Sequence, residues 1–382
     1  MPEQIPLFEI AWDERDMQNA VESIGRGSYW AKGPFVDQFE SELEDFFEVE
    51  HAVVVNSGTT GLVAGLRACG IGPGDEVIVP SFTFIATANA VRLIGATPVF
   101  ADIDADTYGL NPSSVRNKIT EQTAGIVPVH LYGGPCHIDE ILDIADEEDL
   151  VVVEDAAEAF GATFDDKPVG SFGDAGVLSF CQNKVVVTGE GGAVVTDDDE
   201  VAANLRLYRS HGRVSGDYFD SVGSGEYVAL GTNIRMSDLT AAIGCAQIEK
   251  ADDLIEGRRS AARYMNKQLA DVEGVKIPQP IAEGTHVYQL YTVQFDSRSD
   301  RETVIETLAE HDISSKVYWD TPVHRTQYYQ QSSVHESTDL ETTNTIAETV
   351  LSLPIYPDLS ASQADRIVDA VRDGMAQARS DH

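Results

Sequence analysis

From residue 51 onward, short apolar runs alternate with segments of helical spacing. The apolar runs, rich in β-branched residues, predict strands at 51–55, 76–79, 98–103, 126–130 and 150–153. Between them, the spacing predicts helices at 59–69, 84–94 and 138–147; in the first of these, Leu62, Leu66 and Cys69 form one stripe. Strands that are apolar throughout and separated by helices are typical of a parallel sheet covered on both faces. We therefore expect an α/β fold with a mostly parallel central sheet flanked by helices.

The pattern changes after Asp174. Two further strands are predicted at 176–180 and 192–196, followed by helices at 200–210 and 236–254. The remainder carries helices and a few strands, such as 286–295, and is typical of a smaller α+β unit. With 382 residues, the chain is long enough for two cores. We therefore divide it into a large α/β domain with an N-terminal arm, 1–254, and a small C-terminal α+β domain, 255–382.

The charge balance is strongly acidic, with 64 acidic and 26 basic residues and a net charge of −38. Such a surface repels nucleic acid and anionic membranes. The acidic clusters are spread along the chain, as at 40–50 and 197–200, and are interpreted as solvated faces and not as metal sites. Because high salt screens self-repulsion, this dispersed excess with few lysines predicts a halophilic source.

Neither a membrane-spanning apolar run nor the features of a secretory signal are found, so a cytoplasmic protein is expected. The cysteines are far apart and form no C-x-x-C pair. Their apolar or small neighbours favour buried thiols over disulfides or zinc ligands for Cys69, Cys136, Cys181 and Cys245.

Lys184 differs from the other seven lysines of the chain. The others lie among polar or turn-forming neighbours, whereas Lys184 precedes the apolar run 185–187 and a glycine turn at 188–192. An amine near apolar residues is more readily neutral, and a neutral amine can attack a carbonyl to form a Schiff base. A lysine that extends to solvent from a strand end would give the same local pattern. The local pattern alone does not choose between the two.

Three further candidates follow predicted strands. Residues 56–61 join a strand to a helix, where exposed N–H groups can bind a phosphate or simply form a helix cap. Asp155 follows the strand 150–153, at the edge where open α/β sheets hold ligands, and can pair with a buried cation or cap a helix. Phe84 follows another strand, and its ring can reach the same crevice or pack in the core.

Together, the four features indicate pyridoxal 5'-phosphate (PLP). Its phosphate needs helix N–H groups, its pyridine nitrogen needs a carboxylate, and its aldehyde needs a lysine. Each feature is weak alone, but the four in this order are a strong signal. The chain has neither a Walker loop nor a G-x-G-x-x-G fingerprint, which disfavours a nicotinamide oxidoreductase.

The chain resembles the sugar aminotransferases of the DegT/DnrJ/EryC1/StrS family, within fold-type I of the PLP enzymes. The resemblance runs nearly from end to end. It rests on GP (33–34), NSGT (56–59), GPGDEVIVP (72–80), VHLYG (129–133), EDAA (154–157), SF (179–180), NK (183–184), TGEGG (188–192), GTNIRM (231–236) and AAIG (241–244). These motifs are highly specific in combination.

The resemblance implies roles for individual residues. Lys184 matches the lysine that bonds to the cofactor's aldehyde and carries the proton. Asp155 matches the partner of the pyridine nitrogen. Gly58, Thr59 and Ser179 match contacts to the cofactor's phosphate.

Further implied roles lie around the ring and at a subunit contact. Phe84 matches the aromatic residue that stacks on the ring. Asn233 matches an asparagine that reaches the phosphate of the other subunit's cofactor, which implies a homodimer with shared active sites. Glu158 stands near the ring hydroxyl, where most members carry glutamine or histidine and some members acting on GDP-linked sugars carry glutamate. Arg235 matches a recurrent arginine, to which we assign no role at this stage.

The resemblance also implies the reaction. Members that dehydrate their substrate have histidine at the lysine position, so Lys184 favours transamination. We expect transfer of an amino group from L-glutamate to a nucleotide-linked keto-deoxysugar at its 4-keto position, in polysaccharide or glycan biosynthesis. Tyr318 and His324 lie where the small domain could meet the sugar nucleotide, but either could be purely structural. The alternative is a PLP-binding sensor without turnover, although no Lys/Arg-rich segment for DNA binding is present.

Overall fold

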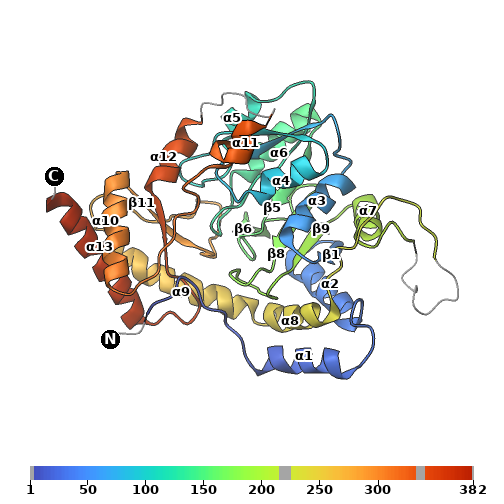
Figure 1. The fold of residues 1–382 in the computed structure, drawn as a ribbon, viewed down its shortest axis with the longest axis horizontal. Helices are drawn as coiled ribbons and strands as arrows, with labels where there is room; N and C mark the ends of the chain where they lie inside the picture. Colours follow the sequence, from blue (N-terminus) through green and yellow to red (C-terminus); the bar gives the residue numbers. More distant parts are fainter. Residues whose placement is uncertain (1–3, 215–224, 333–339, 381–382) are drawn as a thin grey trace.

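A seven-stranded sheet forms the centre of the larger part of the chain (Figure 1). The computed structural model describes residues 4–214, 225–332 and 340–380. The strand order is β1-β9-β8-β5-β4-β2-β3. The strands are β1 (His51–Val55), β2 (Glu76–Pro80), β3 (Thr97–Ala101), β4 (Thr123–Ile126), β5 (Val151–Asp155), β8 (Ala175–Ser179) and β9 (Gly192–Thr196). All neighbouring pairs are parallel except the two that contain β9, which confirms the mostly parallel sheet.

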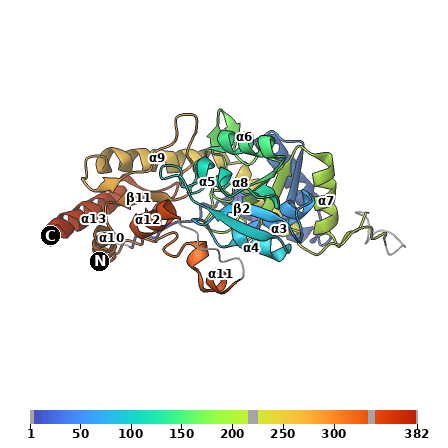
Figure 2. The ribbon, with the colours of Figure 1, turned by 90° about the horizontal axis from the view of Figure 1, so that it is seen from above.

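Helices cover both faces of the sheet, as Figure 2 shows from above. One layer contains α3 (Gly58–Ala68), α4 (Ala86–Leu93) and α7 (Asp199–Arg209). The other contains α2 (Pro34–Phe47), α5 (Pro112–Arg116), α6 (Ile138–Glu148) and α8 (Asp238–Ile248), with α1 (Glu14–Gly25) packed outside α8. Successive strand residues point to opposite faces, so Val53 joins the α3 layer while Val54 joins the α2 layer. This is why the strands are apolar throughout.

The smaller part is an antiparallel sheet with helices on it. It contains β10 (Val275–Lys276), β11 (Tyr291–Phe295), β12 (Val350–Leu353), α9 (Ala251–Leu269), α10 (Arg298–Glu310), α12 (Glu341–Thr349) and α13 (Ala361–Ser380). The N-terminal arm joins it through a bridge between Ile5 and Ile313. The remaining elements are the hairpin β6 (Thr163–Phe164) and β7 (Lys167–Pro168), the 3-10 helix η1 (Val323–Arg325) and α11 (Gln327–Gln331). The proposed domain boundary at 254–255 lies inside α9.

Three predicted elements differ from the observed ones. The strand predicted at 126–130 is β4, which ends at Ile126; beyond it Pro128, which has no N–H, interrupts the ladder, and only an isolated bridge joins Val129 to Asp155. The single helix predicted at 236–254 is split into α8 and α9 at Lys250, whose ammonium contacts Asp13 at 2.9 Å.

The strand predicted at 286–295 begins only at Tyr291, because residues 286–290 hydrogen-bond to Tyr132 and Gly133 instead of pairing within the small sheet. All four cysteines are free, as expected, but only Cys136 and Cys245 are buried, while Cys69 and Cys181 are half-buried. Within the described ranges, no helix has the length and apolar character that a membrane crossing requires.

Candidate active site

Four of the expected site residues lie at one edge of the sheet. Gly58 follows β1, Phe84 follows β2, Asp155 ends β5 and Ser179 ends β8. These four strands run in the same direction, so their carboxyl ends meet at the same edge. Lys184 follows in a loop that closes on itself, since the Gln182 N–H donates to the Gly189 carbonyl at 3.0 Å.

The start of α3 lies against the side chain of Ser179. Ser57 caps the helix, with its Oγ accepting from the Thr60 N–H at 3.2 Å. The first N–H groups of a helix have no hydrogen-bond partner within the helix, and they form the positive end of the helix dipole. A Cβ on Gly58 would lie 3.0 Å from Ser179 Cβ and 3.3 Å from its Oγ. Glycine therefore keeps the helix start and the serine hydroxyl close together, an arrangement that fits a phosphate group.

Asp155 is a buried carboxylate held by two donors. The Thr87 hydroxyl donates to Oδ2 at 2.8 Å, and the Ala157 N–H donates to Oδ1 at 3.3 Å. Burial raises the pKa of Asp155; the hydrogen bonds and the charge of Lys184 oppose this effect only in part. A buried carboxylate of this kind is stabilised by a cation. The side chain is therefore suited to a protonated pyridine nitrogen.

Lys184 pairs inside the protein. Its Nζ lies 3.2 Å from Glu158 Oε1, and the two side chains are 12% and 11% exposed. The Tyr132 N–H donates to the other carboxylate oxygen of Glu158 at 3.1 Å, which fixes that carboxylate. The Asn183 carbonyl accepts from Gln289 Nε2 at 2.5 Å, so a residue close to β11 anchors the lysine loop. The amine does not extend to solvent, so the alternative of a solvent-directed lysine does not hold.

Lys184, Asp155 and Glu158 together carry one cationic and two acidic groups. The charge of Lys184 acts to lower the pKa of Asp155, so the two groups lie close to one another. A cationic ring bound between them would balance the excess carboxylate. Helix N–H groups, a buried carboxylate and a protected lysine, all at one sheet edge, fit PLP at its three attachment points.

The expected aromatic residue lies beside one that the sequence did not indicate. Phe84 is 53% exposed, and its ring centroid lies 5.4 Å from that of Trp319. Next to Trp319, Tyr318 is 8% exposed, and burial together with the charge of Glu158 raises its pKa to about 12. No spacing or composition signal marked Trp319, because it lies in an irregular segment outside the helices and strands.

His324 is hydrogen-bonded to Ser81, the residue that follows β2. Its backbone N–H donates to Ser81 Oγ at 3.0 Å, and its Nδ1 lies 2.6 Å from the same oxygen. With the side chain only 8% exposed, this geometry supports the structural alternative, in which His324 holds the segment of η1 against the end of β2.

Asn233 lies outside the group formed by Lys184, Asp155 and Glu158. Its segment pairs with the end of β1: the Asn56 N–H donates to the Ile234 carbonyl at 2.8 Å. The Asn233 side chain is exposed, and within the described part of the chain no hydrogen bond joins it to those three residues.

Two positioning residues were missed by sequence reasoning. Thr87 lies on α4, about one helical turn after Phe84, and its hydroxyl contacts Asp155. Helical spacing alone could have suggested that Thr87 reaches the same site as Phe84. Glu154 is buried, lies 2.8 Å from His130 Nε2 and accepts from the N–H groups of Phe172 and Gly173 at 2.7 and 2.8 Å. The sequence feature that could have identified Glu154 is an acidic residue within an apolar strand. These contacts fix the end of β5 and therefore the position of Asp155.

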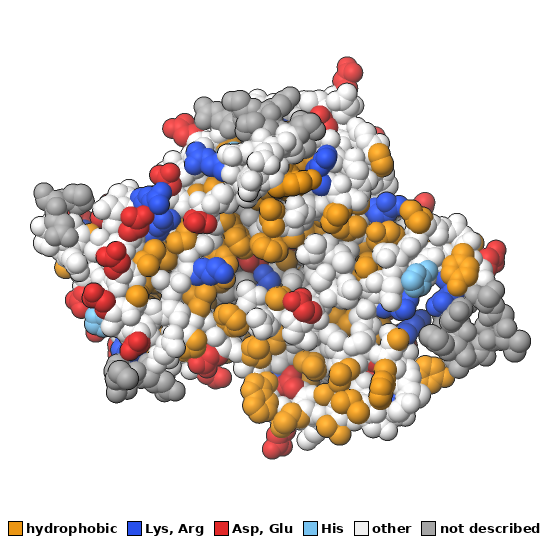
Figure 3. Space-filling model, viewed as in Figure 1, with side chains coloured by type: hydrophobic (Ala, Val, Ile, Leu, Met, Phe, Trp, Pro, Cys, Tyr) orange, Lys and Arg blue, Asp and Glu red, His pale blue; other side chains and the backbone are white. Residues whose placement is uncertain are grey.

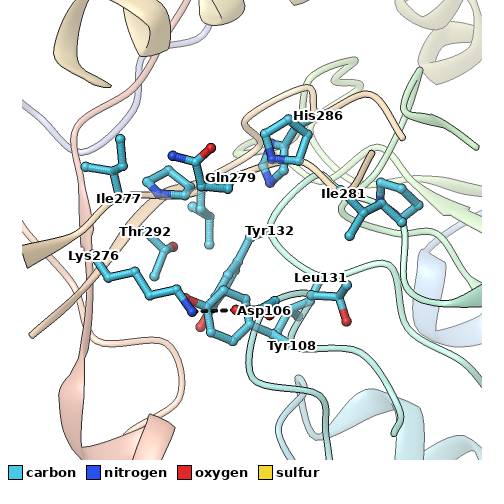
Figure 4. A pocket seen from close by; sticks show the side chains of 16 residues that line it. Asp106, Tyr108, Leu131, Tyr132, Lys276, Ile277, Gln279, Ile281, His286 and Thr292 are labelled. Atoms are coloured by element: carbon cyan, nitrogen blue, oxygen red, sulfur yellow. Dashed lines mark hydrogen bonds and ion pairs between the residues drawn. The ribbon is translucent and has the colours of Figure 1, made fainter. Parts of the chain in front are cut away.

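A cavity of about 330 Å³ lies behind Tyr132, between the two parts of the chain (Figure 4). Tyr108 and Tyr132 line one side, and residues 277–281 and His286 line the other. The ion pair of Lys276 and Asp106, at 2.6 Å, crosses it. Neither Lys184 nor Asp155 lines this cavity, so it is separate from the candidate active site.

Comparison with known proteins gives consistent results. The DegT/DnrJ/EryC1/StrS aminotransferase family model matches residues 12–372. The spore coat polysaccharide biosynthesis protein SpsC of Bacillus subtilis is 37% identical over 381 residues, covering 98% of this chain and 96% of that protein. GDP-perosamine synthase of Caulobacter vibrioides is 39% identical over 343 residues, covering 89% of this chain and 90% of that protein. The crystal structure of DesV from S. venezuelae in complex with a ketimine intermediate matches with a TM-score of 0.90 and 34% identity. The match covers 97% of this chain and 98% of the DesV chain.

Proposed function

The chain belongs to the DegT/DnrJ/EryC1/StrS aminotransferase family, and we propose that it transfers an amino group from L-glutamate to the 4-keto position of a nucleotide-linked keto-deoxysugar. It is a PLP-dependent aminotransferase of the sugar-modifying type. The observation that carries the proposal is the protected pair of Lys184 and Glu158 beside the buried Asp155. A GDP-linked sugar is the first acceptor to test, because the related Caulobacter protein is a GDP-perosamine synthase.

When bound, PLP supplies an aldehyde that bonds to amines and a cationic ring that withdraws electrons. We assign the proton transfers to two residues. The Lys184 amine takes the proton from the α-carbon of the donor and returns it to the reacting carbon. Asp155 would hold the proton on the pyridine nitrogen when the cofactor is bound, and Thr87 holds the carboxylate in place through its hydroxyl.

Other residues bind and orient. The N–H groups of Gly58 and Thr59 and the hydroxyl of Ser179 would hold the cofactor's phosphate. Phe84 would cover the ring of the bound cofactor. Glu158 is fixed by the Tyr132 N–H and holds the Lys184 ammonium at 3.2 Å, so it keeps the amine directed into the site.

We propose a homodimer in which Asn233 reaches the partner subunit's cofactor phosphate. Two features support it. The Asn233 side chain is exposed, and α1 with the residues before it carries an apolar surface on a highly charged chain. On that surface, Trp12, Met17, Val21 and Ile24 are 49% to 67% exposed. Figure 3 shows apolar side chains gathered over α1 at the lower edge of the molecule. Patches of this kind mark association surfaces.

Tyr318 is proposed as a contact for the sugar, because it lies beside Trp319 and its pKa responds to the charge of Glu158. A role in polysaccharide biosynthesis is supported by the name of the B. subtilis relative. The cytoplasmic location and the halophilic source stay predictions.

The function is tested by incubating the cofactor-loaded protein with L-glutamate and a panel of GDP-, UDP- and dTDP-linked keto-sugars, with 2-oxoglutarate and aminosugar as the measured products. Lys184→Ala should abolish both products and the visible absorbance of the lysine-bound cofactor. Lys267→Ala, at an exposed position on α9, is the matched control and should change neither. Turnover by Lys184→Ala would refute the assignment. Cofactor binding by the unchanged protein with no release of 2-oxoglutarate would favour the sensor alternative.

A further inference from the structure

The segment 286–290 lies against the loop that carries Lys184. Within this segment, Gln289 is 2% exposed, and its Nε2 donates to the Asn183 carbonyl at 2.5 Å. In the part of the chain that the structure describes, this is the single hydrogen bond from the backbone of the loop between β8 and β9 to a residue outside that loop and its two strands. Because Lys184 directly follows Asn183, Gln289 fixes the backbone from which the amine extends.

The next residue along the chain supports the partner of Lys184. The Leu290 N–H donates to the Tyr132 carbonyl at 3.1 Å, and the Tyr132 N–H donates to Glu158 Oε2 at 3.1 Å. The other oxygen of Glu158 lies 3.2 Å from Lys184 Nζ. Gln289 therefore supports the amine and Leu290 supports the carboxylate, so two consecutive residues set the separation of the charged pair.

The backbone of the site is shaped for this contact. Tyr132 and Gly133 both have left-handed backbones, with φ of 60° and 107°. A Cβ on Gly133 would lie 2.6 Å from the backbone nitrogen of Gln289, so only glycine lets the two backbones approach this closely. The Val287 N–H donates to the Gly133 carbonyl at 2.7 Å across the same approach.

A buried arginine holds the segment from α9. Arg258 is 2% exposed, and its Nη1 lies within hydrogen-bonding distance of three carbonyl oxygens. The acceptors are the carbonyls of Tyr288 at 3.2 Å, Gln289 at 3.4 Å and Ile355 at 3.3 Å. Ile355 follows β12 of the antiparallel sheet. The position of Gln289 is therefore tied to the core of the smaller part of the chain.

Packing does not explain the polar end of Gln289. Its Oε1 is buried and has no hydrogen-bond partner among the residues that the structure describes. An unpaired buried oxygen is unfavourable, and an apolar side chain of the same size would avoid it. The reverse amide orientation would place this oxygen against the Asn183 carbonyl, which is also an acceptor. The hydrogen bond to the lysine loop is therefore the interaction that glutamine, and not an apolar residue, provides at this position.

We propose that Gln289 is a positioning residue for the Lys184 amine, through which the smaller part of the chain sets the geometry of the amine-transfer centre. The proposal rests on the proposed function, in which Lys184 transfers the proton. Proton transfer requires the amine to lie within hydrogen-bonding reach of the reacting carbon. Without the bond to Asn183, the loop backbone is less restricted and the amine occupies the productive position less often. The rate of proton transfer then falls, whereas the binding of L-glutamate is unchanged.

The first test is a pH titration of the cofactor-loaded protein, followed through the visible absorbance of the lysine-bound cofactor. This absorbance reports the protonation of the Lys184 nitrogen. A nearby carboxylate favours the protonated nitrogen, so loosening its pair with Glu158 should lower the midpoint. In Gln289→Met, the midpoint should fall by up to about one pH unit. Asp155, the other nearby carboxylate, is held by Thr87 and is unchanged by this substitution.

The second test is stopped-flow absorbance after mixing with increasing concentrations of L-glutamate. Gln289→Met should lower the limiting rate constant about twofold to tenfold, the effect of losing one neutral hydrogen bond, and leave the half-saturating concentration unchanged. Gln289→Leu, a second variant without a donor, should behave in the same way. Gln289→His should recover most of the rate, because its Nε2–H can donate to the Asn183 carbonyl.

Gln247→Met is the matched control. Gln247 is 1% exposed, its Nε2 donates to the Ala11 carbonyl at 2.9 Å outside the candidate site, and its Oε1 also has no partner among the described residues. This variant should lower the melting temperature but keep the midpoint and the rate of the parent. Thermal unfolding and cofactor content establish that each variant is folded.

Three results overturn the proposal. The first is a midpoint and rate in Gln289→Met and Gln289→Leu that equal those of the parent. The second is the same change in Gln247→Met, since general destabilisation would then account for it. The third is a loss that Gln289→His does not recover, since packing and not the hydrogen bond would then be responsible. Turnover by Lys184→Ala would instead refute the role of that lysine in the proposed function.

Discussion

Replacing Thr87 by valine should shift the pH dependence of the enzyme. Valine keeps the shape of threonine, and the side chain is 1% exposed, so the fold should tolerate the change. The change removes the 2.8 Å hydrogen bond from the hydroxyl to Asp155 Oδ2 and the 3.0 Å contact of the same hydroxyl with Thr83 Oγ1. A hydrogen bond to a charged group contributes about 1.5–3 kcal/mol. This bond favours the ionised carboxylate against the burial that raises the pKa of Asp155.

The expected displacement follows from that energy. At 1.36 kcal/mol per pH unit, the acidic limb of the rate profile should move up by about 1–2 pH units in Thr87→Val. The assay is stopped-flow absorbance of the cofactor after mixing with L-glutamate, repeated from acidic to alkaline pH. At alkaline pH, where Asp155 is ionised in both proteins, the two rates should converge.

Thr343→Val is the matched control. Thr343 is buried, and its hydroxyl donates to another carboxylate, Asp102, at 2.7 Å outside the candidate site. This variant should lose stability but keep the profile of the parent. A uniform fall in rate at every pH in Thr87→Val, or the same displacement in Thr343→Val, would refute the reasoning.

Three further predictions concern stability and the cofactor. Because burial raises the pKa of Asp155, the cofactor-free folded chain binds that proton more tightly than the unfolded chain, so its stability falls as pH rises from about 3.9 through the folded-state value. Asp155→Asn cannot ionise, so in the cofactor-free form it should exceed the parent in denaturant unfolding at pH 8 but bind the cofactor more weakly. Gly58→Ala should lower cofactor affinity in an absorbance titration, since its Cβ would lie 3.0 Å from Ser179 Cβ. Gly65→Ala, in the same helix with its nearest atom at 3.5 Å, should keep that affinity and gain about 0.5–1 kcal/mol. The melting temperature should rise from dilute buffer to molar salt as the charge of −38 is screened; an unchanged value would remove the halophilic hypothesis.

Local pattern was sufficient for most of the elements and for the nature of the site. Apolar runs predicted β1 and β9 with their observed bounds, because burial on both faces of a sheet leaves a continuous apolar signature. Residues 56–61 after β1, Phe84 after β2 and Asp155 at the end of β5 were identified as candidates from their place at strand ends, whereas Ser179, at the end of β8, was identified only from the family resemblance. The pattern failed at Lys250, where the apolar spacing continues across the joint between α8 and α9.

The amino-acid sequence by itself determined the α/β architecture, the acidic surface and the residue types that attach the cofactor, since each of these depends on composition or on neighbours within one element. The tertiary structure decided which side chains meet. Glu158 faces Lys184, Thr87 faces Asp155, and arginines from α7 lie beside residues 26–32. Periodicity reports which face of an element is buried, whereas contacts between distant segments depend on how the elements pack and on the order of strands in the sheet.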